Sequence, residues 1–144
     1  MGHDERTTWV IVASRDHARR GLRDGFVMAN HGKRAPLARM KIGDGIFIYS
    51  PKTAFPDGEP FRAIAIVGKI TGEAPEPSAA IPGGFRLAAS LREISPLPLS
   101  RIRDQFPVNR VRFGCFSLSS EQSAAIWALV DEGSEAVYVS DVDR

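Results

Sequence analysis

The sequence predicts a mixed α+β domain in which about six strands form a small curled sheet or barrel, with short helices beside it. Two observations predict this class. Segments rich in β-branched, aliphatic and aromatic residues recur along the chain, and helical patterns separate them in irregular succession. The chain has 144 residues, which is the size of one domain and enough for a stable core without disulfides or metal.

The first half of the chain begins with residues 7–14, TTWVIVAS, which have the composition of a central strand. Ser14 is placed to cap a helix over residues 15–25, with Asp16 in its first turn and Gly25 at its end. The next patterns predict a short extended piece at 26–30, a helical turn at 35–40 and a buried strand at 46–50 that Pro51 ends.

The second half continues with a polar loop and a long strand over residues 61–73. A strand is predicted at 85–94, a short helix after Pro98 and an alternating strand at 111–119. Ser119 and Gln122 have the spacing of a capping box for a last helix that ends at Gly133, and residues 136–140 are predicted to form an edge strand.

The domain is expected to be a single unit over residues 9–140, preceded by a disordered or vector-derived N-terminus at residues 1–8. The only cysteine is Cys115, so an intrachain disulfide is impossible. No apolar run approaches the roughly 20 residues of a membrane span, and the polar N-terminus has no secretory signal. These features predict a cytoplasmic protein with no membrane partner.

Positive charge is concentrated in one segment, although the formal net charge is only +2. Residues 14–41 contain eight Lys or Arg and two Asp, and 15 of the 19 cationic residues in the chain are Arg. Arginine stacks on planar rings and holds phosphate through paired hydrogen bonds. The segment indicates an anionic partner or else a solvated helix face, and charge alone leaves both open.

Side chains suited to catalysis or metal binding are few. His3 lies in the tail, which leaves His17 and His31, and no CxxC, HxxxH, P-loop or nucleophile-elbow motif is present. The sequence therefore predicts no catalytic residue, no metal site and no cofactor. An alternative is a small-molecule-binding protein or enzyme that uses His17 or His31 as a base, and a third is a protein-interaction domain with an acidic C-terminal end.

Several aromatic residues are predicted near strand ends, close in sequence to the basic segment. A basic rim beside aromatic rings is the arrangement that recognises single-stranded or flipped bases. Each ring could instead belong to the core.

The motif-rich part of the chain spans residues 9–51, where WVIVAS is followed by HGKRAPLARMKIGDGIFIYSP. Together with AIVGKITGE at 65–73, this pattern resembles the EVE domain family of the PUA-like superfamily, to which YTH domains are related. Weaker similarity continues over residues 85–106 and 112–122. The chain departs from the family pattern at 116–118 and 122–123, which lie outside the expected pocket.

The resemblance implies a PUA-like β-barrel with flanking helices. It also implies a non-enzymatic nucleic-acid-binding module that recognises a modified base in DNA or RNA through an aromatic-lined pocket with a basic rim. Members of the family are fused to nucleases or helicases, so a nuclease or helicase partner is also implied.

The pocket is expected where the first strand ends, residues 26–30 pass and residues 49–51 close it. The candidate ligand-binding residues fall into three groups: ring walls at Trp9, Phe26 and Tyr49, base-edge partners at Ser14, Asn30 and Ser50, and phosphate partners at His17, Lys33, Arg34 and Arg39. Arg39 could instead form an ion pair with Asp44, and the sequence leaves that choice open.

Overall fold

The computed structural model describes residues 6–142, and within them the side chains of residues 6–132. In chain order, the elements are β1 (Thr8–Val12), α1 (Arg15–Asp24), β2 (Phe26–Val27), α2 (Arg34–Ala38), β3 (Gly45–Lys52), β4 (Pro60–Ile70), β5 (Glu76–Pro77), β6 (Phe85–Pro98), α3 (Leu99–Ile102), the 3₁₀ helix η2 (Val108–Phe113), β7 (Cys115–Ser117) and α4 (Ser120–Val142). Among these elements, no helix is both long enough and apolar enough to cross a membrane.

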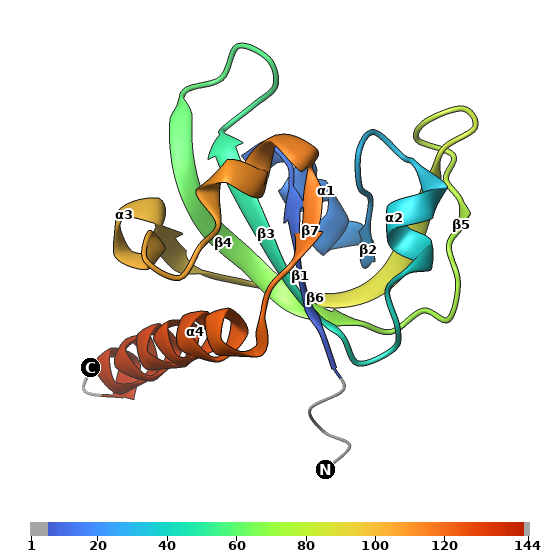
Figure 1. The fold of residues 1–144 in the computed structure, drawn as a ribbon. Helices are drawn as coiled ribbons and strands as arrows, with labels where there is room; N and C mark the ends of the chain where they lie inside the picture. The colour runs from blue at the N-terminus through green and yellow to red at the C-terminus, as the bar shows by residue number, and fades with distance from the viewer. Residues whose placement is uncertain (1–5, 143–144) are drawn as a thin grey trace.

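One curled sheet organises the domain (Figure 1). The strand order is β2-β6-β4-β3-β1-β7, and the two-residue strand β5 also pairs with β6. The pair β1 and β3 is parallel, with Thr8 opposite Gly45 and Val12 opposite Tyr49, and the other pairs are antiparallel. This confirms the predicted α+β class with a curled mixed sheet and short flanking helices.

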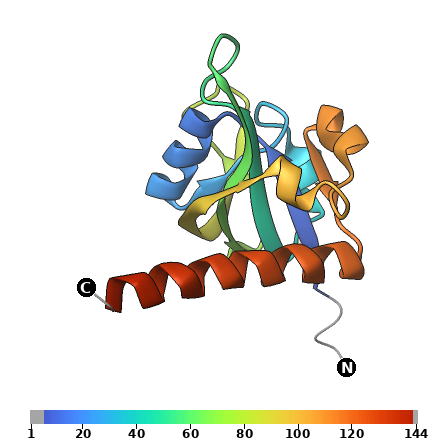
Figure 2. The same ribbon diagram turned by 90° about the vertical axis from the view of Figure 1, so that its left-hand side faces the viewer.

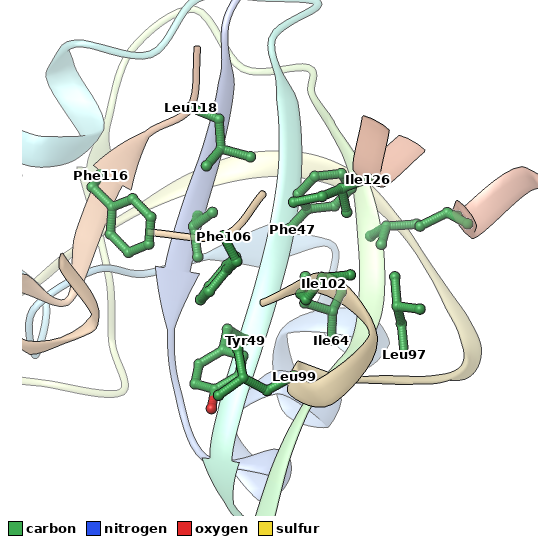
Figure 3. Packing of buried hydrophobic residues seen from close by; sticks show 13 residues of the cluster. Phe47, Tyr49, Ile64, Leu97, Leu99, Ile102, Phe106, Phe116, Leu118 and Ile126 are labelled. Carbon is green, nitrogen blue, oxygen red and sulfur yellow. The ribbon is translucent and has the colours of Figure 1, made fainter. Parts of the chain in front are cut away.

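Two apolar clusters cover the two faces of the sheet, because successive side chains of a strand point to opposite faces. In β3, Phe47 and Tyr49 pack with α3 and α4, as Figure 3 shows for their neighbours Leu99, Ile102 and Ile126. The alternate residues Ile46 and Ile48 pack in a second cluster with Ala18 of α1 and Leu37 of α2. The long helix α4 crosses beneath the sheet in Figure 2.

The buried carboxylate of Asp44 fixes the start of the parallel pair. Asp44 is 4% exposed, and its Oδ2 accepts hydrogen bonds from Trp9 Nε1 and from the backbone N–H of Lys41, both at 2.9 Å. Its Oδ1 accepts from the backbone N–H of Thr7 at 3.1 Å. Three N–H donors on one ionised carboxylate satisfy its buried charge and hold the β1 entrance beside the turn before β3.

The helix predicted after Ser14 is confirmed: Ser14 is its N-cap, and Gly25 ends it with a left-handed φ of 79°. The capping box is also confirmed. Ser119 Oγ accepts from the N–H of Gln122 at 3.1 Å, and Gln122 Oε1 accepts from the N–H of Ser119 at 2.9 Å.

Several predicted boundaries were wrong. The strand predicted at 85–94 continues to Pro98 as β6. Strand β3 continues through Pro51 to Lys52, because the register shifts there and the missing N–H of proline costs no ladder bond. Residues 108–113 form a 3₁₀ helix that Gly114 ends, so the apparent alternation from Val111 describes a strand only at Cys115–Ser117. Helix α4 continues to Val142, so residues 136–140 are helical, since one glycine is tolerated within a helix.

Some of the predictions concern residues that the structure does not describe. Of the N-terminus expected at residues 1–8, residues 1–5 lie outside the described part, as do Asp143 and the side chains of Glu135 and Asp141 in the acidic C-terminal end.

We predict that Asp44→Asn lowers the free energy of unfolding by about 2–3 kcal/mol, because either orientation of the amide turns its NH₂ group toward a buried N–H donor. Urea denaturation measures the change. The exposed Asp57→Asn variant is the control and should change stability by less than about 0.5 kcal/mol. Equal effects of the two substitutions would contradict the role given to Asp44.

Candidate functional site

A pocket of about 590 Å³ lies where the parallel strands β1 and β3 both end. We call it the edge pocket. Its lining comes from six segments of the chain: Val12, Ala13 and Ser14; His17; Met28, Asn30, His31 and Gly32; Pro51, Lys52 and Phe55; Ile81; and Val111, Arg112 and Gly114. This is the place in the fold where the sequence led us to expect a pocket.

The beginning of α1 forms one wall of the edge pocket. Ser14 is nearly buried, and its Oγ accepts a hydrogen bond from the backbone N–H of His17 at 3.4 Å. The N–H of Asp16 donates to the carbonyl of Thr53 at 3.0 Å, which ties the helix start to the loop after β3. The imidazole of His17 therefore projects from a helical turn that is fixed on both sides.

A strained stretch of backbone forms the opposite wall. Asn30 and His31 have φ values of 50° and 61°, and Gly32 follows with a φ of 92°. Left-handed conformations cost non-glycine residues roughly 1–2 kcal/mol each, although asparagine and histidine tolerate them better than most. Such strain persists where the surroundings hold it, and it concentrates at ligand sites. Both strained residues line the edge pocket.

Asn30 is held against Gly114, the residue that ends η2. A Cβ atom at Gly114 would lie 1.8 Å from Asn30 Oδ1, so only glycine fits beneath the amide. Gly114 also has a φ of 77° and its carbonyl accepts from the N–H of Val12 at 2.9 Å. The Asn30 amide is thus positioned by the β1 end and by η2 together.

The mouth of the edge pocket combines an exposed ring with cations. Phe55 is 73% exposed, and its ring centroid lies 6.2 Å from that of His31 with the planes tilted by 53°. Lys52 and Arg112 lie on the lining from two different segments. The apolar side chains of Met28 and Ile81 complete the lining with a surface suited to a flat ring.

Partial burial lowers the pKa of the His17 imidazole from its usual value, which favours the neutral ring. The positive charge of Arg20 lowers the pKa further, His31 adds to the effect, and Asp16 opposes it. A neutral imidazole has one N–H donor and one nitrogen acceptor, so it can pair with a base edge.

Three of the ten predicted site residues, Ser14, His17 and Asn30, come together at the edge pocket. Tyr49 and Ser50 do not: they are 3% and 2% exposed, and the Tyr49 ring packs 5.2 Å from that of Phe106. Tyr49 shares a face of β3 with Phe47, so strand alternation directs it into the core beneath α3, as Figure 3 shows.

The other two predicted ring walls also lie elsewhere. Trp9 directs its indole N–H to Asp44 at the beginning of β1, at the opposite end of that strand from the pocket. Phe26 lies in β2, and the guanidinium of Arg86 covers its ring at 3.7 Å from the centroid. Both rings have structural partners that sequence alone did not reveal.

The predicted phosphate partners in and next to α2 are exposed but do not line the pocket. Among the described residues, Lys33, Arg34 and Arg39 take part in no ion pair, so Arg39 is not bound to Asp44. Three of the four arginines of α1 differ from them. Arg15 and Arg19 form ion pairs with Glu93, and Arg23 pairs with Asp24.

The sequence did not reveal two cations, one aromatic ring, one methionine and one glycine of the lining: Lys52, Arg112, Phe55, Met28 and Gly114. One signal was available for Phe55, because a phenylalanine within a polar, proline- and glycine-rich loop has no core to enter. Arg112 was hidden by the incorrect strand prediction at 111–119.

A second hollow of about 470 Å³ lies at the opposite ends of β1 and β3, lined in part by Arg6, Lys69 and Trp127. Three of its polar groups already have partners: Trp127 Nε1 donates to Thr8 Oγ1 at 3.2 Å, and that hydroxyl lies 2.6 Å from Ser123 Oγ. The edge pocket is the better candidate because, among residues 6–132, the His17 imidazole and the Asn30 amide that line it form no side-chain hydrogen bond. Within residues 6–132, no group of three or more His, Cys, Asp or Glu side chains could hold a metal ion.

The chain is similar to known proteins along most of its length. The model of the EVE domain family matches residues 7–129. A UPF0310 protein of Mycobacterium avium is 36% identical over 112 residues, which cover 75% of this chain and 81% of the relative. A UPF0310 protein of Mycolicibacterium vanbaalenii is 49% identical over 69 residues, and that match spans only 48% of each protein.

Solved structures share the fold at low sequence identity. The YTH domain of the Zygosaccharomyces rouxii MRB1 protein, in complex with N6-methyladenosine RNA, has a TM-score of 0.62 at 14% identity and covers 88% of each chain. Human THYN1 protein, in complex with 5-methylcytosine containing DNA, has a TM-score of 0.53 at 14% identity. Its match covers 85% of this chain and 96% of THYN1.

We predict that Gly114→Ala destabilises the protein by about 2 kcal/mol more than Gly83→Ala, as measured by urea denaturation. Both glycines have a φ near 76°, at 77° and 75°, but a Cβ atom at Gly83 would meet nothing within 4 Å. The Gly83 variant therefore measures the backbone strain alone. Equal destabilisation would show that the Asn30 amide is not held against Gly114.

We predict that NMR titration gives His17 a pKa below 6.5, and that Arg20→Gln raises this pKa toward 6.5 by removing a neighbouring positive charge. Arg34→Gln is the control, since Arg34 is not among the groups that shift His17. A His17 pKa at or above 6.5 in the unmodified chain would contradict the neutral imidazole assigned to the pocket.

Proposed function

Because the chain belongs to the EVE domain family, we propose that it is a non-enzymatic module that binds nucleic acid and recognises a modified base in the edge pocket. The observation that carries the proposal is the composition of that pocket. A neutral imidazole and a fixed amide face a cavity with apolar sides, and cations stand at its mouth.

Each part of the pocket has a role in this proposal. Met28 and Ile81 contact the faces of the base, while the neutral His17 and the Asn30 amide each offer a donor and an acceptor to its edge. Lys52 and Arg112 at the mouth bind the phosphates next to the bound nucleotide. The exposed cations Lys33, Arg34 and Arg39 extend the positive charge along the adjoining surface.

The volume of the edge pocket agrees with this use, since about 590 Å³ lies in the range of small-molecule sites. Two proteins of the same fold were solved with a methylated base in RNA or in DNA. They support nucleic acid as the partner of this fold, and they leave both polymers as candidates for this chain.

The alternative of an enzyme that uses a histidine base has less support. Among residues 6–132, no carboxylate forms a hydrogen bond or ion pair with His17 or His31, so neither imidazole has an orienting acid. A cytoplasmic location, expected from the sequence features, and a nuclease or helicase partner, implied by the family resemblance, are further parts of the proposal.

The experiment compares the binding of oligonucleotides with one N6-methyladenine or one 5-methylcytosine, in RNA and in DNA, with their unmethylated counterparts. We expect one modified probe to bind at least about 10-fold more tightly than its counterpart, and we expect His17→Ala to remove most of that preference. Arg23→Ala is the control, because Arg23 pairs with Asp24 and does not line the pocket.

The same assay tests the assignment of the cations. Affinity should fall with added salt, and Lys52→Gln should reduce the slope of log K against log salt by about 1 without altering the methyl preference. Lys69→Gln, at the second hollow, should leave that slope unchanged. No preference for any modified probe, with a flat response to salt, would overturn the proposed function.

A further inference from the structure

Phe55 is an exposed ring that the core does not explain. It is 73% exposed, more than the other large exposed apolar side chains of the described residues, which are Ile42 at 55%, Phe113 at 54% and Val108 at 38%. The loop that carries it joins β3 to β4 and projects beyond the sheet in both views (Figures 1 and 2). Covering such a ring with a ligand would remove apolar surface from water, which is favourable.

The loop around Phe55 is internally fixed. The N–H of Thr53 donates to the carbonyl of Glu59 at 2.9 Å, and the N–H of Glu59 donates to Thr53 Oγ1 at 3.0 Å. Within this closed ring of bonds, the N–H of Gly58 donates to the carbonyl of Ala54 at 3.0 Å. A Cβ atom at Gly58 would lie 2.2 Å from the nitrogen of Ala54, so the chain crosses itself too closely for any other residue.

Two further contacts join this loop to the edge pocket. The ammonium group of Lys52 donates to the carbonyl of Pro56 at 3.0 Å, and the carbonyl of Thr53 accepts from the first turn of α1. The backbone that carries Phe55 is therefore held beside the edge pocket, and the ring centroid lies 6.2 Å from that of His31. A backbone that is already fixed lowers the entropy that must be lost when a second ring stacks on Phe55.

The position of Phe55 matches the next base of a strand. A base in the edge pocket leaves its flanking phosphates at the mouth, where Lys52 and Arg112 lie, and the neighbouring base then falls outside the cavity. Aromatic side chains bind such bases by stacking, with little dependence on sequence.

We propose that Phe55 is a stacking subsite for the nucleobase next to the one held in the edge pocket, so that the ligand is a strand of two or more nucleotides. This inference rests on the proposed function, and it adds a second base site that the pocket itself does not contain. In this inference, the cavity selects the modified base, and Phe55 makes a strand bind more tightly than a free nucleotide.

The test measures dissociation constants for a methylated nucleoside 5′-monophosphate and for a trinucleotide with the same methylated base at its centre. The probes are N6-methyladenosine and 5-methylcytidine compounds, and the tighter-binding pair is used. The unmodified chain should bind the trinucleotide about 10-fold or more tightly than the monophosphate. Phe55→Ala should lose most of that gain and lower the monophosphate affinity far less, whereas Phe55→Trp should keep both affinities.

A third kind of probe separates stacking from other effects. Two such probes each lack the base on one side of the methylated nucleotide. For one of them, the affinity of the unmodified chain should fall to the affinity that Phe55→Ala has for the complete trinucleotide. Ile42→Ala is the control, because Ile42 is 55% exposed and does not line the edge pocket. This control should bind all probes as the unmodified chain does.

Three results would overturn the inference. An unchanged trinucleotide affinity in Phe55→Ala would show that the ring makes no contact with the strand, and a change in oligomeric state in the same variant would assign it to a protein contact. An equal loss for monophosphate and trinucleotide would make Phe55 a wall of the cavity. If none of these probes binds the unmodified chain, the proposed function fails as well, which distinguishes the two failures.

Discussion

The parallel pairing of β1 with β3 is the constraint on which the rest of the structure depends. Parallel strands end at the same edge of a sheet, so this pair brings Ser14 and Pro51, which are far apart in the chain, to one edge. The antiparallel neighbours β4 and β7 then close around the pair and supply the two apolar faces. The buried Asp44 carboxylate sets the register at the other end of the strands, where it joins Thr7 and Trp9 to the turn before β3.

Several contacts hold the backbone at the edge created by this pair. The left-handed backbone of Asn30 and His31 is unfavourable by itself, and it persists because Gly114 leaves room only for the Asn30 amide. The beginning of α1 and the β3–β4 loop are joined by the bond from Asp16 to Thr53. Polar groups are therefore fixed before a ligand arrives, which reduces the entropy that binding must overcome. The charges are also in place before a ligand binds. The His17 imidazole with its lowered pKa lines the cavity, and the cations Lys52 and Arg112 lie at its mouth.

Much of the fold could be predicted from sequence, because its signals are local. Ser14 and Gly25 define α1 through capping chemistry, and Ser119 with Gln122 define the start of α4. The prediction failed where local pattern and tertiary context differ: the alternation from Val111 occurs in a 3₁₀ helix, and Pro51 lies inside a strand at a shift of register.

The site was only partly predictable for a related reason. The positions of Ser14 and Asn30 could be predicted from where strands and turns end. The direction of a ring depends instead on which face of the strand its residue occupies, and Tyr49 lies on the same face of β3 as the core residue Phe47. Trp9 and Phe26 have partners, Asp44 and Arg86, that are distant in sequence. Phe55 and Arg112 join the pocket only through the closure of the whole sheet, and no local pattern contains that information.

We infer that the edge pocket, and not the second hollow, holds the base. NMR chemical-shift mapping with a methylated nucleoside 5′-monophosphate can distinguish the two cavities, because each has its own reporter group. Binding in the edge pocket should give saturable shifts of the Asn30 side-chain amide and the Met28 methyl group, with the Trp127 indole N–H unchanged. Saturable shifts of the Trp127 indole with the Asn30 and Met28 signals unmoved would contradict this inference.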